Sequence, residues 1–99
     1  MNFVGIAEHS PAQCPGTSDE VFELVSSTMP NLPELEAKHG VKNLGIHVMV
    51  SAHKIIIVLD APSFEAAEMV LLESKLASWN TVQLSQTYTP AEAMQLTRL

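Results

Sequence analysis

The sequence predicts an α+β domain in which four strands and two main helices follow one another in the order βαββαβ. Two closely spaced apolar runs, 41–50 and 53–60, are typical of a β-hairpin in the middle of the chain. On either side of this hairpin lies one segment with helical periodicity. The length of 99 residues and the hydrophobic content of 46% fit a single domain over 1–99 with one core.

The first strand is expected over Phe3–Glu8, where Val4 and Ile6 alternate with small residues. The loop over 9–17 contains two prolines and a glycine, which exclude regular structure there. Thr17 and Glu20 form a capping-box pattern that predicts the start of the first helix. That helix carries a stripe of residues at helical spacing, which we expect to be buried: Val21, Leu24, Val25 and Thr28.

Pro30 is expected to break this helix. A second short helix then begins near Asn31 or Leu32, and Gly40 ends it in the left-handed conformation. In the hairpin that follows, Ser51 and Ala52 form the turn, so that Val50 faces His53. This register puts aliphatic residues on one face of the sheet, a mixed set on the other, and Asn43 opposite Asp60. The aliphatic face contains Leu44, Ile46, Val48, Ile55, Ile57 and Leu59, and the mixed face contains His47, Ile56 and Val58.

The second main helix is expected over 64–79, with Ser63 as its N-cap. Its apolar residues extend beyond one stripe, more than the surface of a solvated monomer requires. A fourth strand is expected over 81–88. Thr89 and Glu92 then form another capping box, which opens a short terminal helix ending near Leu96.

A central hairpin and right-handed crossovers together favour a sheet with the spatial strand order 4-1-3-2, in which both helices cover one face. The uncovered face would contain Phe3 or its neighbours, together with His47, Ile56 and Val58. Such a face is too apolar to remain in water, and a second sheet is the simplest cover. We therefore expect the partner of this protein to be a second copy of itself, in a homodimer.

The stretch HKIIIVLDAPSFEAAEMVLLESKLASWNTVQL, residues 53–84, resembles the dimeric α/β-barrel superfamily. The opening EHSPAQCP, residues 8–15, resembles small members of that superfamily with an N-terminal His-Ser/Thr-Pro-x-x-Cys loop. The resemblance implies a ferredoxin-like fold, with a four-stranded antiparallel sheet, helices on one face and a dimeric barrel. Because the superfamily includes monooxygenases, haem-degrading enzymes, isomerases and stress proteins, the resemblance implies a cavity and no particular reaction.

A group of histidines with one cysteine is the main functional feature of the sequence. In the expected topology, the end of the first strand, the end of the second and the start of the third meet at one edge of the sheet. Imidazole and thiolate are the usual ligands of zinc, copper and iron. We therefore expect His9, Cys14 and His53 to bind a transition metal. His47 or Met49 would be a fourth ligand or would contact the metal ligands from outside, and both could bind a small molecule. His47, however, has the parity of the opposite sheet face from His53.

Several alternatives remain open at this point. Cys14 could be only a small buried apolar residue, or a nucleophile activated by the helix that follows it. His39, next to Gly40, could be a cation at the C-terminal end of a helix, where it would complement the negative end of the helix dipole. The dimer itself could be the function, with no ligand and no cofactor. Alternatively, the protein could be a cofactor-free enzyme for a small molecule, with His47 as acid or base. Whether the protein is an enzyme is therefore not determined.

Charge and cysteine content limit the partners and the location. Five Lys and Arg residues against eleven Asp and Glu residues give a net charge of -6, which argues against nucleic acid and anionic membranes as partners. Cys14 is the only cysteine, so no internal disulfide can form. The first residues also lack a basic segment followed by an apolar run. These observations predict a cytoplasmic protein.

Overall fold

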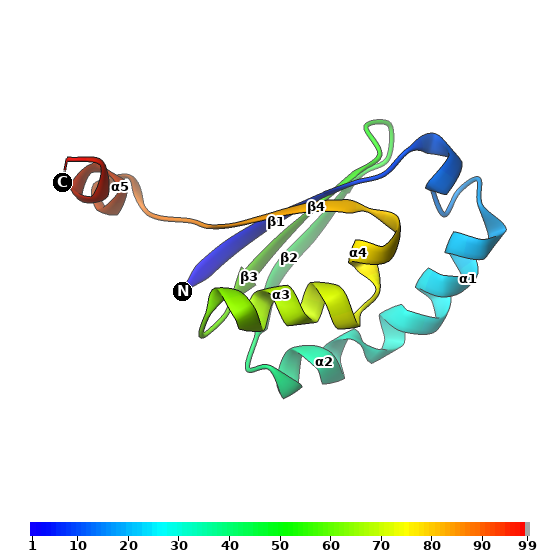
Figure 1. Cartoon of the computed structure of the whole chain (residues 1–99), viewed down its shortest axis with the longest axis horizontal. Helices are drawn as coiled ribbons and strands as arrows, with labels where there is room; N and C mark the ends of the chain where they lie inside the picture. The colour runs from blue at the N-terminus through cyan, green and yellow to red at the C-terminus, as the bar shows by residue number, and fades with distance from the viewer. Residues whose placement is uncertain (99) are drawn as a thin grey trace.

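The computed structural model describes residues 1–98 and shows a four-stranded antiparallel sheet. The strands lie in the order β2-β3-β1-β4 (Figure 1). They are β1 (Asn2–Glu8), β2 (Lys42–Met49), β3 (Lys54–Asp60) and β4 (Thr81–Gln86). The predicted α+β class and the predicted spatial order of the strands are thus confirmed.

Of the five α-helices among residues 1–98, four lie together beside the sheet. The other stands away from the body at the end of an extended segment (Figure 1). The four are α1 (Asp19–Thr28), α2 (Leu32–Lys38), α3 (Phe64–Glu73) and α4 (Leu76–Trp79), and the fifth is α5 (Pro90–Thr97). Two short 3₁₀ turns, η1 (Pro11–Gln13) and η2 (Met29–Asn31), precede α1 and α2. Within residues 1–98, none of these helices has both the length and the apolar character needed to cross a bilayer.

The core forms between the helices and one face of the sheet. Alternate residues of β3, Ile55, Ile57 and Leu59, are buried, because successive side chains of a strand point to opposite faces. Phe3 is 0% exposed, and its ring packs edge-on against Phe64 with centroids 6.1 Å apart. Of the two alternatives expected for the open face, Phe3 or its neighbours, Phe3 is therefore excluded. Its neighbours on the other parity occupy that face.

The predicted hairpin register is confirmed over most of its length. Ile46 pairs with Ile57 and Val48 with Ile55. At Leu44 the register shifts, so that Asn43 pairs with Leu59 and Lys42 with Asp60. The predicted pairing of Asn43 with Asp60 is wrong because a bulge inserts one residue into β2. The side-chain oxygen Oδ1 of Asn43 accepts a hydrogen bond of 2.9 Å from the Gly45 amide, which gives this backbone amide a partner at the bulge.

The first helix begins one residue later than the capping-box pattern predicts. Ser18 is the N-cap, and its Oγ accepts a hydrogen bond of 3.3 Å from the Val21 amide. Thr17 lies one residue before this cap, and its hydroxyl donates to the carbonyl oxygens of Pro11 and Cys14. The break after α1 and the left-handed Gly40, at φ +67°, are as predicted.

The predicted helix over 64–79 is interrupted. Ser63 caps it as expected, with its Oγ 3.1 Å from the Ala66 amide, but α3 ends at Glu73. Lys75 adopts the left-handed conformation, at φ +68°, and α4 starts afresh after it. The prediction of one continuous helix is therefore wrong: the change of direction brings Trp79 and Asn80 into the core, and both are at least 92% buried.

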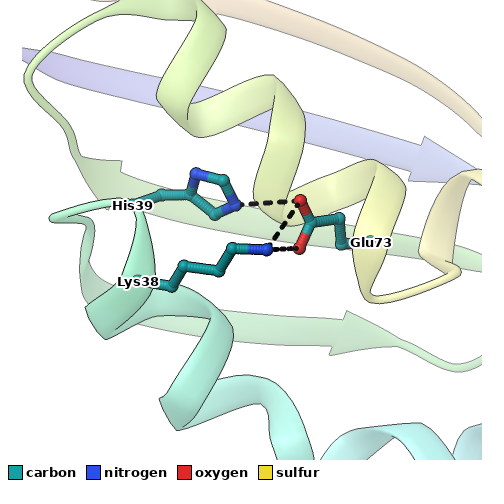
Figure 2. Close-up of polar contacts among 3 residues, drawn as sticks. All are labelled: Lys38, His39 and Glu73. Carbon is teal, nitrogen blue, oxygen red and sulfur yellow. Dashed lines mark hydrogen bonds and ion pairs between the residues drawn. The ribbon is translucent and has the colours of Figure 1, made fainter.

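A polar cluster joins α2 to α3 (Figure 2). Lys38 Nζ lies 3.2 Å from Glu73 Oε2, and His39 Nε2 lies 3.1 Å from Glu73 Oε1. The Lys38 ammonium, and after it the His39 ring, lower the pKa of the Glu73 carboxyl. His39, at the C-terminal end of α2, therefore contacts a carboxylate of α3.

The end of the chain follows the prediction in part. The fourth strand ends at Gln86, two residues short of the expected boundary. Thr89 and Glu92 form the predicted reciprocal capping box, with hydrogen bonds of 2.9 and 3.2 Å. Three large side chains of this segment remain exposed, and they are Tyr88, Met94 and Leu96.

Candidate metal centre

Three side chains from separate parts of the chain meet at one end of the sheet. They are His9, directly after β1, Cys14, in the loop before α1, and His53, in the turn between β2 and β3. One ring nitrogen of each histidine and the Cys14 sulfur lie within 4.8 Å of one another. This is the group that the sequence predicts from the antiparallel topology.

The two histidines are held together through the backbone. Glu8 pairs with Lys54 at the end of the β1–β3 ladder, and the His9 amide donates a hydrogen bond of 3.1 Å to the His53 carbonyl oxygen. The His53 amide closes the turn by donating to the Val50 carbonyl oxygen, at 3.3 Å. His53 has a φ of +53°, a left-handed conformation that is unfavourable for a side chain with a Cβ.

Backbone hydrogen bonds also fix the loop that carries Cys14. The Cys14 carbonyl oxygen accepts from the amides of Thr17, at 3.0 Å, and Ser18, at 2.8 Å. The Thr17 hydroxyl ties the same loop to the Pro11 carbonyl oxygen. As a result, the start of α1 and the position of Cys14 are determined by one compact turn.

Asn80 orients the ring of His9. Asn80 Nδ2 donates to the Leu76 carbonyl oxygen at 3.1 Å, which leaves its Oδ1 as the acceptor 2.8 Å from His9 Nδ1. An acceptor at this position favours the tautomer with a proton on Nδ1 and a free lone pair on Nε2. The sequence analysis treated Asn80 only as the end of a helix, and no sequence signal connects it with a residue 71 positions away.

One ring nitrogen of each of these two histidines lacks a hydrogen-bond partner. Within residues 1–98, His9 Nε2 and His53 Nδ1 are buried and make no hydrogen bond. Buried polar atoms are normally paired, because an unpaired one costs about 1 to 3 kcal/mol. Two such nitrogens beside a thiol are therefore available to coordinate an ion.

The distances suit a metal site after a small adjustment. With bond lengths of about 2.0 to 2.3 Å, the ligand atoms of a tetrahedral zinc ion lie roughly 3.3 to 3.6 Å apart. Side-chain rotations that move the ligand atoms by about 1 Å would shorten the distances between them from 4.8 Å to this range. Two imidazoles and one thiolate suit zinc, copper or iron, and three protein ligands leave one position open. The group could therefore hold a metal ion.

The group borders an apolar cavity of about 360 Å³ between the sheet and the helices. Residues of β2, β3 and all four helices of the body line this cavity, and His9, Cys14 and His53 line it as well. The two histidines also line a second hollow, together with polar residues such as Glu8, Gln13 and Ser78. The histidine pair thus lies between an apolar space and a polar one.

The remaining predicted site residues differ in their placement. Met49 lines the apolar cavity. His47 is exposed on the open face of the sheet and does not join the metal-binding group. Its ring lies over Gly45, where a Cβ atom would come within 3.1 Å of His47 Nε2. The structure therefore brings His9, Cys14 and His53 together at this edge and leaves His47 out of the group.

Comparison with known proteins gives little further information. No protein family matches the sequence, and no curated protein matches it. Among solved structures, the chain is similar to a candidate transposase from Deinococcus radiodurans R1, with a TM-score of 0.45 and 14% sequence identity. That match covers 99% of this chain and 86% of the other. We infer neither chemistry nor a partner from a similarity of this size.

Proposed function

We propose that the protein binds a transition metal ion, zinc, copper or iron, through His9, Cys14 and His53. The observation that carries this proposal is the convergence of one ligand atom from each of the three residues within 4.8 Å. In addition, one ring nitrogen of each histidine, His9 Nε2 and His53 Nδ1, is buried and lacks a partner among residues 1–98. Such nitrogens are costly in an apolar interior unless something coordinates them. Asn80 supplies the outer contact that orients a ligating histidine.

The open coordination position is proposed to face the apolar cavity, where a small molecule would bind. Met49 lines this space and is retained as a ligand-binding residue. A metal with an open position supplies Lewis-acid chemistry and lowers the pKa of a bound water. The protein supplies the enclosing walls, which exclude bulk water from the bound molecule.

We also propose that the protein is a homodimer in a ferredoxin-like, dimeric α/β-barrel arrangement, and that it is cytoplasmic. Two features support the dimer. The open face of the sheet presents Val4, Ile6, Ile56 and Val58, which no helix of the same chain covers within residues 1–98. In addition, α5 has eight residues and projects from the body, and so short a helix is marginal in water without a surface to pack on. The alternative that His47 acts as acid or base depends on this dimer and stays a prediction.

Metal analysis of protein purified without a histidine tag tests the proposal. We expect about one equivalent of zinc, copper or iron per chain. We also expect affinity to fall by on the order of 100-fold or more in Cys14→Ser, His9→Ala and His53→Ala, since zinc-binding free energies of about 10 to 16 kcal/mol are shared among a few ligands.

The chain contains two matched controls. His47→Ala removes an exposed histidine, and His39→Ala removes one that contacts Glu73, so both variants should retain the metal. Sub-stoichiometric metal in the wild type after incubation with zinc would refute the proposal. So would metal content that Cys14→Ser leaves unchanged.

A further inference from the structure

The cavity beside the metal centre contains a third buried polar atom. Glu36 of α2 lines it, and Glu36 Oε2 is buried without a hydrogen-bond partner. Within residues 1–98, three buried side-chain nitrogen or oxygen atoms lack a partner: this one, His9 Nε2 and His53 Nδ1. All three residues line the same cavity. A buried carboxylate oxygen without a donor is unfavourable. Because all three unpaired atoms belong to residues of one cavity, we expect the molecule that fills this cavity to have polar groups opposite these atoms.

Glu36 and the metal centre lie at opposite ends of this space. The Val41 amide donates to the Glu36 carbonyl oxygen at 2.8 Å, which places Glu36 beside the start of β2. His53 lies in the turn after the end of β2, and Figure 1 shows α2 and this turn at opposite ends of the sheet. β2 has eight residues and strands advance about 3.3 Å per residue, so its two ends are roughly 26 Å apart. Side chains that reach into the cavity from both ends shorten the gap between their tips to the order of 15 Å.

The wall between the two ends is mainly aliphatic. Ile46 from β2, Ile57 from β3 and Leu71 from α3 line it, and the last two are at least 95% buried. An occupant that touches both ends must therefore have an apolar middle, because any polar group there would lose its hydrogen bonds to water without replacement.

We propose that the cavity binds an elongated apolar molecule with a metal-coordinating group at one end and a positively charged amine at the other. This inference rests on the proposed function, since the coordinating group would fill the open position of the metal held by His9, Cys14 and His53. The amine would donate to Glu36 Oε2, because an ionised carboxylate only accepts hydrogen bonds and pairs best with a charged donor. Glu36 would thus select amines over unsubstituted chains of the same length.

The full chain loaded with Co²⁺ provides the test, because coordination by thiolate and imidazole gives Co²⁺ an absorption spectrum that changes when a further ligand binds. The two probes are a 1-alkylimidazole and the 1-(ω-aminoalkyl)imidazole of equal length, with roughly ten to twelve carbons to match the gap. We expect the amine to bind about tenfold or more tightly than the plain chain, as a charge-assisted hydrogen bond would provide. This preference should fall to about onefold in Glu36→Gln and persist in Glu34→Gln, which removes an exposed carboxylate from the same helix.

The outcomes separate this inference from the metal proposal. Equal affinities of the two probes for the wild type, or an unchanged preference in Glu36→Gln, would overturn the role of Glu36 while the cobalt spectrum still reports the metal site. No cobalt binding by the wild type would overturn the metal proposal and this inference together. Glu36→Met is a second variant that fills the space with an apolar side chain, and in it the plain chain should bind at least as tightly as in the wild type. Weaker binding of the plain chain there would contradict an apolar cavity at this end.

Discussion

The side-chain oxygen of Asn80 lies 2.8 Å from His9 Nδ1, and the amide nitrogen of the same side chain donates to the Leu76 carbonyl oxygen. These two hydrogen bonds fix which atom of Asn80 faces the histidine, and hence which ring nitrogen of His9 is free. The free nitrogen, Nε2, is buried and makes no hydrogen bond, and His9 belongs to the group with Cys14 and His53. The geometry of the candidate centre thus depends on a residue that does not itself reach the ion.

Removing this contact should weaken metal binding without abolishing it. In Asn80→Leu the acceptor is lost, and we expect metal affinity to fall by about 10- to 100-fold, as for other partners of ligating histidines. Asn80→Asp retains an acceptor and should keep most of the affinity, although it loses the donor to Leu76. A competitive titration with a metal indicator measures both. Equal losses in the two variants would mean that Asn80 acts only by filling space in the core.

The left-handed conformation of His53 should lower the free energy of unfolding of the metal-free protein. Asn tolerates the left-handed region better than His, so His53→Asn should leave the free energy of unfolding of the metal-free protein unchanged or raise it by up to about 1 kcal/mol. The same variant should lose metal binding. Urea unfolding in the presence of a chelator measures the stability.

Lys75→Asn is the matched control, because Lys75 is also left-handed but lies outside the metal-binding group. Lys75→Asn should likewise leave the free energy of unfolding unchanged or raise it by up to about 1 kcal/mol, and it should bind metal as tightly as the wild type. A loss of more than about 1 kcal/mol in His53→Asn would instead show that the imidazole is needed as a packed side chain.

The contact of Glu73 with α2 should make stability depend on pH. Because Lys38, with His39, lowers the pKa of Glu73 in the folded state, ionised Glu73 stabilises the fold at neutral pH. This stabilisation is lost as the pH falls below the ordinary glutamate value of about 4.3 and through the lower folded-state value. Glu73→Gln should therefore melt at a lower temperature than the wild type at pH 7, and the difference should shrink below about pH 4.

Glu68→Gln removes an exposed carboxylate from the same helix and provides the comparison for Glu73→Gln. Glu68→Gln should melt at the same temperature as the wild type both at pH 7 and below about pH 4. If the difference for Glu73→Gln stayed constant across this range, the stabilisation would not come from the ionised carboxylate.

A charge on the open sheet face should separate the proposed dimer. Ile6 is 39% exposed in the single chain and lies at the centre of that face. Ile6→Lys would place two unpaired charges in a symmetric interface, and each buried unpaired charge costs several kcal/mol, so dissociation should increase by more than about 100-fold. Sedimentation velocity at micromolar concentration distinguishes the species. Phe22→Lys, on an exposed part of α1, should leave the association intact, and a wild type that sediments as a monomer would exclude the dimer.

The strand order and most of the register could be predicted because they follow from local patterns. The short turn at Ser51 and Ala52, with aliphatic residues at matched parity, permits few alternatives, and Ile46 pairs with Ile57 as expected. The bulge at Leu44 could not be predicted from this pattern, since the residues around it suit either register. The break at Lys75 likewise has no local cause: neither Ser74 nor Lys75 is a strong helix breaker, and the packing of Trp79 and Asn80 in the core accompanies the change of direction.

The three residues of the candidate centre were predictable because topology alone brings them to one edge. The backbone pairing of the end of β1 with the start of β3 places His9 beside His53, independently of the conformations of their side chains. Asn80 and Glu36 were not predictable in the same way. Their roles depend on a hydrogen bond and on a buried oxygen, and both of these arise from how α4 and α2 pack on the sheet.

Trp79 is the single tryptophan of the chain, and its ring centroid lies 5.0 Å from that of His9. Its intrinsic fluorescence therefore originates within contact distance of the metal-binding group. Paramagnetic ions such as Cu²⁺ and Co²⁺ quench emission at this range, whereas Zn²⁺, with no unpaired electrons, does not quench by that route. The domain thus contains its own optical reporter, through which loading of the site can be followed in real time without labelling the protein.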